Sequence, residues 1–285
     1  MPQAPDIFDS AFMRQLQALE AALLRLKGRG GEGHVARGRA AGQNEFHGHR
    51  PYVAGDDLRR LDWNAYGRLG KLFLREFEPE KHEHITLVVD RSRSMAAGDK
   101  HVFARHVAAA FGYLTLNQGG SATLAGGATI SGPSRFSRLL DALREAEPDQ
   151  ATGLGPALKA IAATPKPPAD LVVVGDLLEP VEVLEPLQTL TRRGTNVTLV
   201  QVLSHDEADP AAGGNVELHG LEEGEALRLR LGDAVIAAYR AQLEGHLQAI
   251  GNLARHYGWT HVVAESGDDL RELFVRELLP AGAAP

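Results

Sequence analysis

The chain has 285 residues, of which 44% are hydrophobic and 24% are charged, and its formal charge is −7. This apolar fraction is enough for a large folded core and excludes a mainly disordered protein. The sequence contains no cysteine, which excludes disulfides, thiolate metal sites and a cysteine nucleophile. No apolar run approaches the roughly 20 residues of a membrane-spanning helix, and Asp6 and Asp9 stand where a signal peptide carries positive charge. We therefore expect a soluble, cytoplasmic protein without membrane insertion.

An amphipathic helix is predicted near the N-terminus, over residues 9–27. Its apolar residues recur at steps of three and four, Asp9 or Ser10 can cap its start, and Gly28 can end it. The glycine-rich residues 28–33 follow no strand and lead into no Gly-Lys-Ser/Thr sequence. We interpret them as a linker rather than as a phosphate-binding loop.

Residues 25–82 are basic although the chain as a whole is acidic, with 12 Lys/Arg against 8 Asp/Glu. A basic, glycine-rich segment can bind nucleic acid. Here acidic residues alternate with the basic ones, and few aromatic side chains are available to stack on bases. We expect a loop-rich subdomain with internal ion pairs and no nucleic-acid binding, and we keep a nucleic-acid module as an alternative.

Short apolar strands alternate with helices from residue 84 onward. The apolar pattern predicts strands over 85–89, 122–130 (a strand or hairpin), 171–174, 197–203 and 260–264, and helices over 100–116, 137–147, 156–163, 181–193 and 233–257. Continuous apolar runs are typical of parallel strands that are buried on both faces. The predicted fold is α/β, a three-layer, doubly wound, mostly parallel sheet. It comprises residues 84–285, with an added hairpin near 213–231, behind a smaller N-terminal helix, strand and loop subdomain at 1–83.

Oxygen-bearing side chains follow two of the predicted strands. Asp90, Ser92 and Ser94 alternate directly after the first strand, and Asp176 follows a later one. Thr152 precedes the helix predicted at 156–163 and can also be its N-cap. The carboxyl ends of strands in an open α/β sheet are where ligands gather. Because carboxylates and hydroxyls are hard ligands, we expect a site for Mg²⁺, with Mn²⁺ or Ca²⁺ as alternatives to it, and not for Zn²⁺. A vacant position on the ion then favours an incoming acidic side chain.

This pattern resembles that of von Willebrand factor A-type domains. Asp90, Ser92 and Ser94 match their Asp-x-Ser-x-Ser signature, and Thr152 and Asp176 fall where the metal-ion-dependent adhesion site takes its threonine and second aspartate. The resemblance implies that both serines and the threonine contact the cation directly. It also implies that the aspartates act largely through water and that a ligand carboxylate completes the octahedron. Gly153 stands where many relatives carry a polar residue.

A second motif lies within residues 45–80, where a Gly-Asp-Asp turn is followed by Asp-Trp. Its spacing, Arg-x-Tyr-x-x-Gly-Asp-Asp-x-Arg-x-x-Asp-Trp followed by an arginine, resembles the hallmark of the bacterial DUF58 (domain of unknown function) family. The matching residues are Arg50, Tyr52, Gly55, Asp56, Asp57, Arg59, Asp62, Trp63 and Arg68.

The DUF58 resemblance runs from about Leu16 to the C-terminus, and it implies that Tyr239, His246 and Gly258 fall within the family's C-terminal helix. It implies a von Willebrand A-like domain that works beside a MoxR-type AAA+ ATPase in a chaperone-like system that assembles or activates other proteins. The hallmark can also be a knot of ion pairs with an aromatic anchor that joins the two parts of the chain. We expect Trp63 to pack as that anchor.

The charged hallmark residues are Asp56, Asp57 and Arg59, and two roles are kept for them: they stabilise the fold, or they are presented to a partner. Together the two motifs predict a non-enzymatic protein-interaction module. Its partners would be the ATPase and an unknown client protein that presents an acidic side chain.

Two other chemistries are weighed against this function. A strand that ends in aspartate could belong to a metal-dependent phosphohydrolase with Asp90 as nucleophile, but that chemistry normally has an acidic aspartate where Ser92 stands. The pairs His47-x-His49 and His82-x-His84 are feasible zinc half-sites. Because neither pair has an obvious third ligand nearby, we expect them on solvent-exposed strand faces.

Overall fold

The structure is a computed structural model that describes residues 6–29, 46–52, 61–77, 83–148, 153–210, 215–219, 226–230 and 232–283. The chain divides into two compact units. Residues 1–37 and 84–285 form one, called the sheet domain below, and residues 38–83 form the other, called the small unit.

The sheet domain is built on a six-stranded sheet with the order β10-β7-β6-β3-β4-β5. All neighbouring pairs are parallel except β4 with β5. From β3 the chain passes to β4 on one side and later returns to β6 on the other, so the strand order reverses between β3 and β6. The six strands are β3 (His84–Val89), β4 (Ser121–Leu124), β5 (Thr129–Ser131), β6 (Asp170–Gly175), β7 (Asn196–Leu203) and β10 (Thr260–Glu265).

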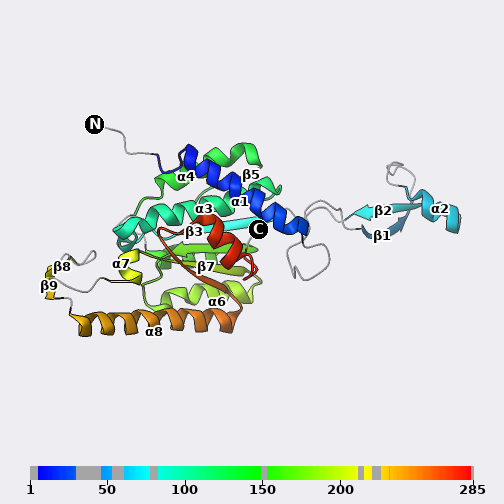
Figure 1. The fold of residues 1–285 in the computed structure, drawn as a ribbon. Helices are drawn as coiled ribbons and strands as arrows, with labels where there is room; N and C mark the ends of the chain where they lie inside the picture. Colours follow the sequence, from blue (N-terminus) through cyan, green and yellow to red (C-terminus); the bar gives the residue numbers. More distant parts are fainter. Residues whose placement is uncertain are drawn as a thin grey trace. The chain divides into compact units, whose positions relative to one another are not determined.

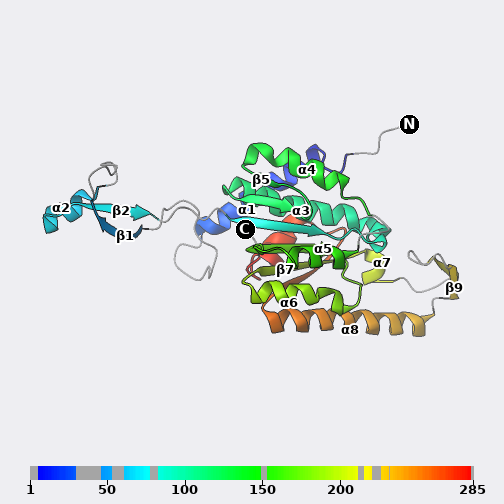
Figure 2. The ribbon, with the colours of Figure 1, turned by 180° about the vertical axis from the view of Figure 1, so that it is seen from behind.

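Helices cover both faces of this sheet and make three layers (Figures 1 and 2). One face carries α1 (Ser10–Arg29), α3 (Lys100–Asn117), α4 (Phe136–Glu145) and α9 (Leu270–Glu272), which continues as a π-helix over Leu273–Leu278. The other carries α5 (Leu154–Ala162), α6 (Glu185–Arg192) and α8 (Asp233–Tyr257). The predicted α/β, three-layer, mostly parallel architecture is confirmed.

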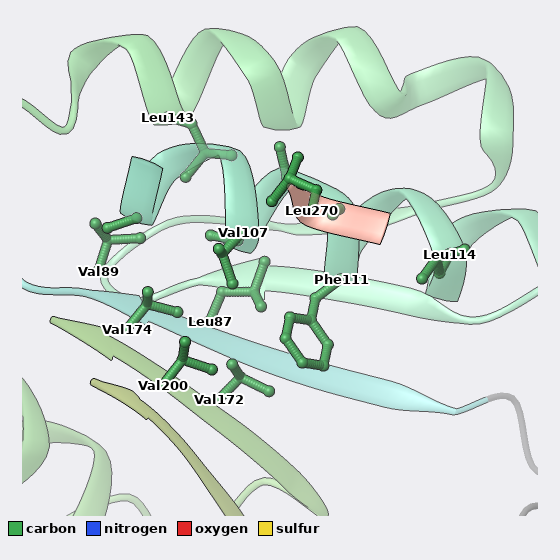
Figure 3. Packing of buried hydrophobic residues seen from close by; sticks show 14 of the residues in the cluster. Leu87, Val89, Val107, Phe111, Leu114, Leu143, Val172, Val174, Val200 and Leu270 are labelled. Atoms are coloured by element: carbon green, nitrogen blue, oxygen red, sulfur yellow. The ribbon is translucent and has the colours of Figure 1, made fainter. Parts of the chain in front are cut away.

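The main core lies between α3 and the sheet. Figure 3 shows Phe111 and Val107 of α3 beside Leu87, Val172 and other strand side chains. Each of these four side chains is at most 3% exposed. Continuous apolar strands and an alanine-rich helix face allow this close approach, because small side chains bring the helix backbone near the sheet.

The first helix corrects the predicted domain boundary. We predicted residues 1–83 as one subdomain, but α1 packs on the sheet domain. Leu16 and Leu19 are fully buried in its core, and the Tyr113 hydroxyl of α3 donates a hydrogen bond to Glu20 over 2.9 Å. The apolar stripe of α1 is long enough to pack along the core of the sheet domain. This packing, and not the position of α1 in the sequence, decides which unit the helix belongs to.

The small unit holds an antiparallel pair of strands and one helix. β1 (Phe46–Pro51) pairs with β2 (Phe73–Phe77), and α2 (Trp63–Leu69) lies between them in sequence. Asp62 starts α2, because its Oδ1 accepts the Ala65 backbone N–H over 3.0 Å. This is N-terminal capping by a buried aspartate.

Further elements lie after β7. The short helix α7 (His205–Ala208) follows that strand directly, and β8 (Asn215–His219) and β9 (Ala226–Arg230) form an antiparallel pair. The helix α8 has the predicted bounds and ends at Gly258, whose φ of 72° suits a residue without a side chain. Among the helices of the described ranges, none has the length and apolar character needed to cross a membrane.

Candidate functional site

Asp90 and Asp176 lie at the carboxyl ends of neighbouring strands, where the strand order reverses. Asp90 follows β3 and Asp176 follows β6, and the Asp90 N–H donates to the Val174 carbonyl over 2.8 Å. The two side chains are 2% and 1% exposed. This reversal is the usual binding position in a doubly wound sheet.

The turn after β3 gathers the predicted oxygen ligands. Asp90 Oδ1 accepts the backbone N–H of Ser92 over 2.8 Å, and the Ser92 and Ser94 hydroxyls are 2.9 Å apart. Asp90 and Ser92 are buried. The Asp-x-Ser-x-Ser spacing therefore brings one carboxylate and two hydroxyls into one turn.

Burial and like charge both act on Asp90. Burial, together with the neighbouring carboxylates of Asp176 and Glu179, raises its pKa to about 6, against the lowering effect of its hydrogen bonds with Ser92. Gly175 provides the space, because a β-carbon there would lie 2.4 Å from the Asp90 Cβ. The site holds a carboxylate whose charge is poorly compensated.

Asp176 is held by a lysine that the sequence analysis did not single out. Asp176 Oδ2 accepts a hydrogen bond from Lys100 Nζ over 2.9 Å, and its Oδ1 accepts the Leu178 N–H over 3.2 Å. Lys100 is the first residue of α3 and is fully buried. The sequence places Lys100 near the start of the helix that follows the serine turn, which was the available signal for a role in the site. Its partner Asp176 could not be predicted in this way, because it lies 76 residues away in sequence.

The same ammonium also binds Glu207 of α7. Lys100 Nζ lies 2.6 Å from Glu207 Oε1, and Glu207 Oε2 accepts the Ser204 N–H over 2.8 Å. Ser204 in turn caps α7 by accepting the Glu207 N–H. This capping box was readable as Ser-x-x-Glu after the strand, although its link to the site was not.

The loop after β6 is supported by α8. Leu177 follows Asp176 with a φ of 50°, a conformation rare for a side chain of this size. Its carbonyl accepts a hydrogen bond from His246 Nε2 over 2.6 Å, and the Tyr239 hydroxyl donates to the Glu207 carbonyl over 3.1 Å. Two residues of α8 thus hold the backbone on both sides of the Lys100 ammonium.

Thr152, the third predicted hydroxyl ligand, lies outside the described residues, so its place stays a prediction. The neighbouring Gly153 is described. A β-carbon on Gly153 would lie 2.6 Å from Glu179 Oε1, so the glycine leaves room for that carboxylate. This close approach gives a physical reason for the departure from the von Willebrand pattern at position 153.

The DUF58-type hallmark is described only in part. Gly55, Asp56, Asp57 and Arg59 lie outside the described residues. Arg50 lies in β1, Tyr52 follows that strand, and Arg68 lies in the last turn of α2.

Trp63 does not pack into a core within the small unit, and its expected role as an anchor that joins the two parts of the chain stays a prediction. Its side chain is 65% exposed and meets the edge of the half-exposed Tyr66 ring, with centroids 6.3 Å apart. Trp63 is the first residue of α2, and it is the preceding Asp62 that turns inward to cap the helix.

The histidine pairs are also only partly described. His84 was expected on an exposed strand face, but it is half-buried, with Nδ1 2.8 Å from the Ser121 hydroxyl, and burial lowers its pKa. His47 and His49 lie in β1, and His82 falls outside the described residues. Within the described ranges, no three or more histidine, aspartate or glutamate side chains form a group that could hold a metal ion.

The donor set at the strand ends suits a hard cation in its chemistry. It consists of carboxylate and hydroxyl oxygens alone, and the Asp90 carboxylate is buried beside other carboxylates. One feature differs from an open metal site, since Lys100 already engages Asp176. The chemistry of the described donors is therefore compatible with a divalent cation at the serine turn, although Asp176 Oδ2 is engaged by Lys100.

Comparison with known proteins identifies the family. The family described as "Protein of unknown function DUF58" matches residues 48–249. The chain belongs to the DUF58 family. This DUF58 chain is 27% identical over 232 residues to the uncharacterized protein Rv1480 of Mycobacterium tuberculosis, a match that covers 71% of this chain and 70% of the relative. The uncharacterized protein Mb1516 of Mycobacterium bovis matches with the same values.

Two solved structures are similar to the DUF58 chain at low identity. The conserved hypothetical protein BatB from Bacteroides thetaiotaomicron has a TM-score of 0.43 at 15% identity, which covers 71% of this chain and 100% of that chain. An aerotolerance-related membrane protein from Bacteroides fragilis, with multiple mutations to serines, has a TM-score of 0.40 at 16% identity, with coverages of 69% and 98%. The comparisons establish the family and name no function for it.

Proposed function

We propose that this DUF58 chain is a non-enzymatic, divalent-metal-dependent protein-interaction module with a von Willebrand A-like sheet domain. The observation that carries the proposal is the meeting of the serine turn and two buried aspartates at the point where the strand order reverses. Mg²⁺, or Mn²⁺ or Ca²⁺ in its place, would be held by Asp90, Ser92, Ser94, Thr152 and Asp176.

The charge of the site supports a cation. Asp90 and Asp176 are almost fully buried, and the Asp176 carboxylate lies close enough to raise the pKa of Asp90. A divalent ion offsets this repulsion. It also supplies a Lewis-acidic position for one further oxygen ligand, which suits the carboxylate of an acidic side chain on a client protein.

The hydroxyl geometry favours binding over group transfer. The Ser92 hydroxyl contacts the Ser94 hydroxyl over 2.9 Å, and a hydroxyl is a poor general base or acid at neutral pH. Ser92 also stands where a phosphohydrolase that uses an aspartate nucleophile needs its acid. These residues can orient a ligand without transferring a proton.

The family resemblance supports the partners in this proposal. We place the chain beside a MoxR-type AAA+ ATPase in a chaperone-like pair, with a client protein that presents an acidic side chain. The small unit, with its exposed Trp63 and Tyr66, is a second surface that the partners could use.

The test combines metal binding with partner capture. The purified full chain is titrated with Mn²⁺ and Mg²⁺ by isothermal titration calorimetry, and it is used to capture a purified MoxR-type ATPase of the same organism in Mg²⁺ or in EDTA. We expect Ser92→Ala/Ser94→Ala to abolish metal binding and Mg²⁺-dependent capture while the circular dichroism spectrum stays native.

Ser134→Ala/Ser137→Ala is the matched control, because these exposed serines lie at the start of α4 and away from the strand ends. Equal capture in Mg²⁺ and EDTA would contradict the metal-dependent proposal. Phosphatase turnover that is lost in Asp90→Asn would replace it with the enzyme alternative.

A further inference from the structure

Lys100 is a fully buried lysine that is neutralised by two carboxylates from different strand ends. Its side chain is 0% exposed, and its Nζ lies 2.9 Å from Asp176 after β6 and 2.6 Å from Glu207 after β7. Lysine is almost never fully buried without such partners, because removing its charge from water is costly. The two contacts make Lys100 a structural counter-ion at the same edge of the sheet as the candidate metal site.

The backbone just before Lys100 packs directly against Ser204. Gly98 has a φ of 59°, and a β-carbon there would lie 2.3 Å from the Ser204 Cβ. Its carbonyl also accepts a hydrogen bond from the Ser266 hydroxyl over 2.7 Å. The start of α3 is therefore packed against the ends of β7 and β10, and this packing places Lys100 beside its two carboxylates.

The Lys100 ammonium neutralises the acidic groups of the site unequally. It contacts Asp176 and Glu207, whereas the contact that the structure gives Asp90 Oδ1 is the Ser92 N–H. One positive charge is thus placed on the Asp176 side of the site. A divalent cation that approaches the serine turn meets both the attraction of Asp90 and the repulsion of Lys100.

We propose that Lys100 is a built-in competitor of the divalent cation. It keeps Asp176 and Glu207 compensated when no metal is bound, and it weakens the affinity of the strand-edge site for the metal. The competition rests on the proposed metal site, whereas the counter-ion role of Lys100 does not. That role explains how the Asp176 carboxylate can stay buried beside Asp90 at one sheet edge in the metal-free chain.

The test is a thermodynamic cycle on the full chain in EDTA, with the variants Lys100→Met, Asp176→Asn and the double variant. We expect Lys100→Met to lower the unfolding midpoint by roughly 10 °C, because it strands a buried carboxylate. The double variant should recover most of that loss. Lys159→Met, an exposed lysine of α5, is the matched control and should leave the midpoint unchanged.

Mn²⁺ titration calorimetry on the same proteins tests the competition. We expect Lys100→Met to bind Mn²⁺ at least about tenfold more tightly than the wild type, since it removes a positive charge within a few ångströms of the site. If Lys100→Met fails to fold in EDTA, recovery by added Mn²⁺ or by Asp176→Asn is the expected result.

The counter-ion role and the competition can each be overturned separately. The counter-ion role is wrong if Lys100→Met loses no stability in EDTA, or if Asp176→Asn gives no recovery. The competition is wrong if the wild type binds Mn²⁺ and Lys100→Met binds it no more tightly. Absence of Mn²⁺ binding in every protein would overturn the proposed function and the competition together, while the EDTA cycle still decides the counter-ion role.

Discussion

Asp90 and Gly175 are packed so closely that a β-carbon on Gly175 would lie 2.4 Å from the Asp90 Cβ and 2.8 Å from its Oδ2. Gly175 is the last residue of β6 and lies directly before Asp176. The absence of a side chain at this position therefore lets the two aspartates share one edge of the sheet. The contact involves a β-carbon, which cannot move away by a change of rotamer.

Gly175→Ala should destabilise the sheet domain by about 1–3 kcal/mol, because overpacking forces backbone or side-chain shifts. Urea unfolding of the full chain measures this loss. The matched control is Gly245→Ala in α8, where a β-carbon meets no atom within 4 Å. It should be neutral or should stabilise by up to about 1 kcal/mol. Equal stabilities of the two variants would contradict the close packing.

Asp90→Asn should stabilise the metal-free chain at pH 7–8. Because the pKa of Asp90 is about 6 in the folded chain and its ordinary value is 3.8, the folded state binds the proton more tightly. Stability is then lost as pH rises from about 4 through 6, by at most about 3 kcal/mol. The variant removes this cost and keeps an oxygen for the Ser92 N–H. The measurement is urea unfolding in EDTA at pH 5 and pH 8, and equal pH dependence in variant and wild type would contradict it.

His106 should make the chain less stable in mild acid. It is partly buried, stacks on Phe12 with ring centroids 4.3 Å apart, and its Nε2 donates to the Ile7 carbonyl over 2.6 Å. Burial lowers its pKa below the usual 6.5, so the unfolded chain takes up a proton first as pH falls. Stability is fully present above pH 6.5 and is lost below it.

Unfolding free energies of wild type and His106→Gln at pH 7.5 and 5.5 test this. The variant should be less stable at pH 7.5 but should lose less on acidification. The exposed His256→Gln should follow the wild type. Protonation of Asp90 stabilises the folded chain over the same pH interval. The losses of stability are therefore compared between the proteins, and the pH dependence of the wild type alone is not used.

Substitutions of Asp62 and Trp63 should have unequal effects on the small unit although the two residues are adjacent. Asp62→Ala removes the N-cap of α2 and should cost about 1–2 kcal/mol. Trp63→Ala removes an exposed side chain and should change the stability of α2 little. Hydrogen exchange of peptides from residues 61–77 in the full chain measures both. Faster exchange in Trp63→Ala than in Asp62→Ala would contradict this assignment.

The periodicity of the sequence was enough to predict the elements of the sheet domain. The bounds of α8 were predicted to the residue, and strands such as β7 to within one residue, because burial on both faces leaves a continuous apolar run. The same strands place Asp90 and Asp176 at one edge, since parallel strands end on the same side. Local pattern therefore determined the fold class and the meeting of these two residues.

Tertiary packing alone decided the partners of these elements. Lys100 finds Asp176 and Glu207 across 76 and 107 residues, and no local pattern encodes a contact at that distance. The apolar stripe of α1 shows that the helix buries one face but not which unit covers it. The sequence also does not show that Asp62, rather than Trp63, is the buried residue at the start of α2. Hydrophobic periodicity reports burial, whereas the choice of partner depends on which surfaces the folded chain brings together.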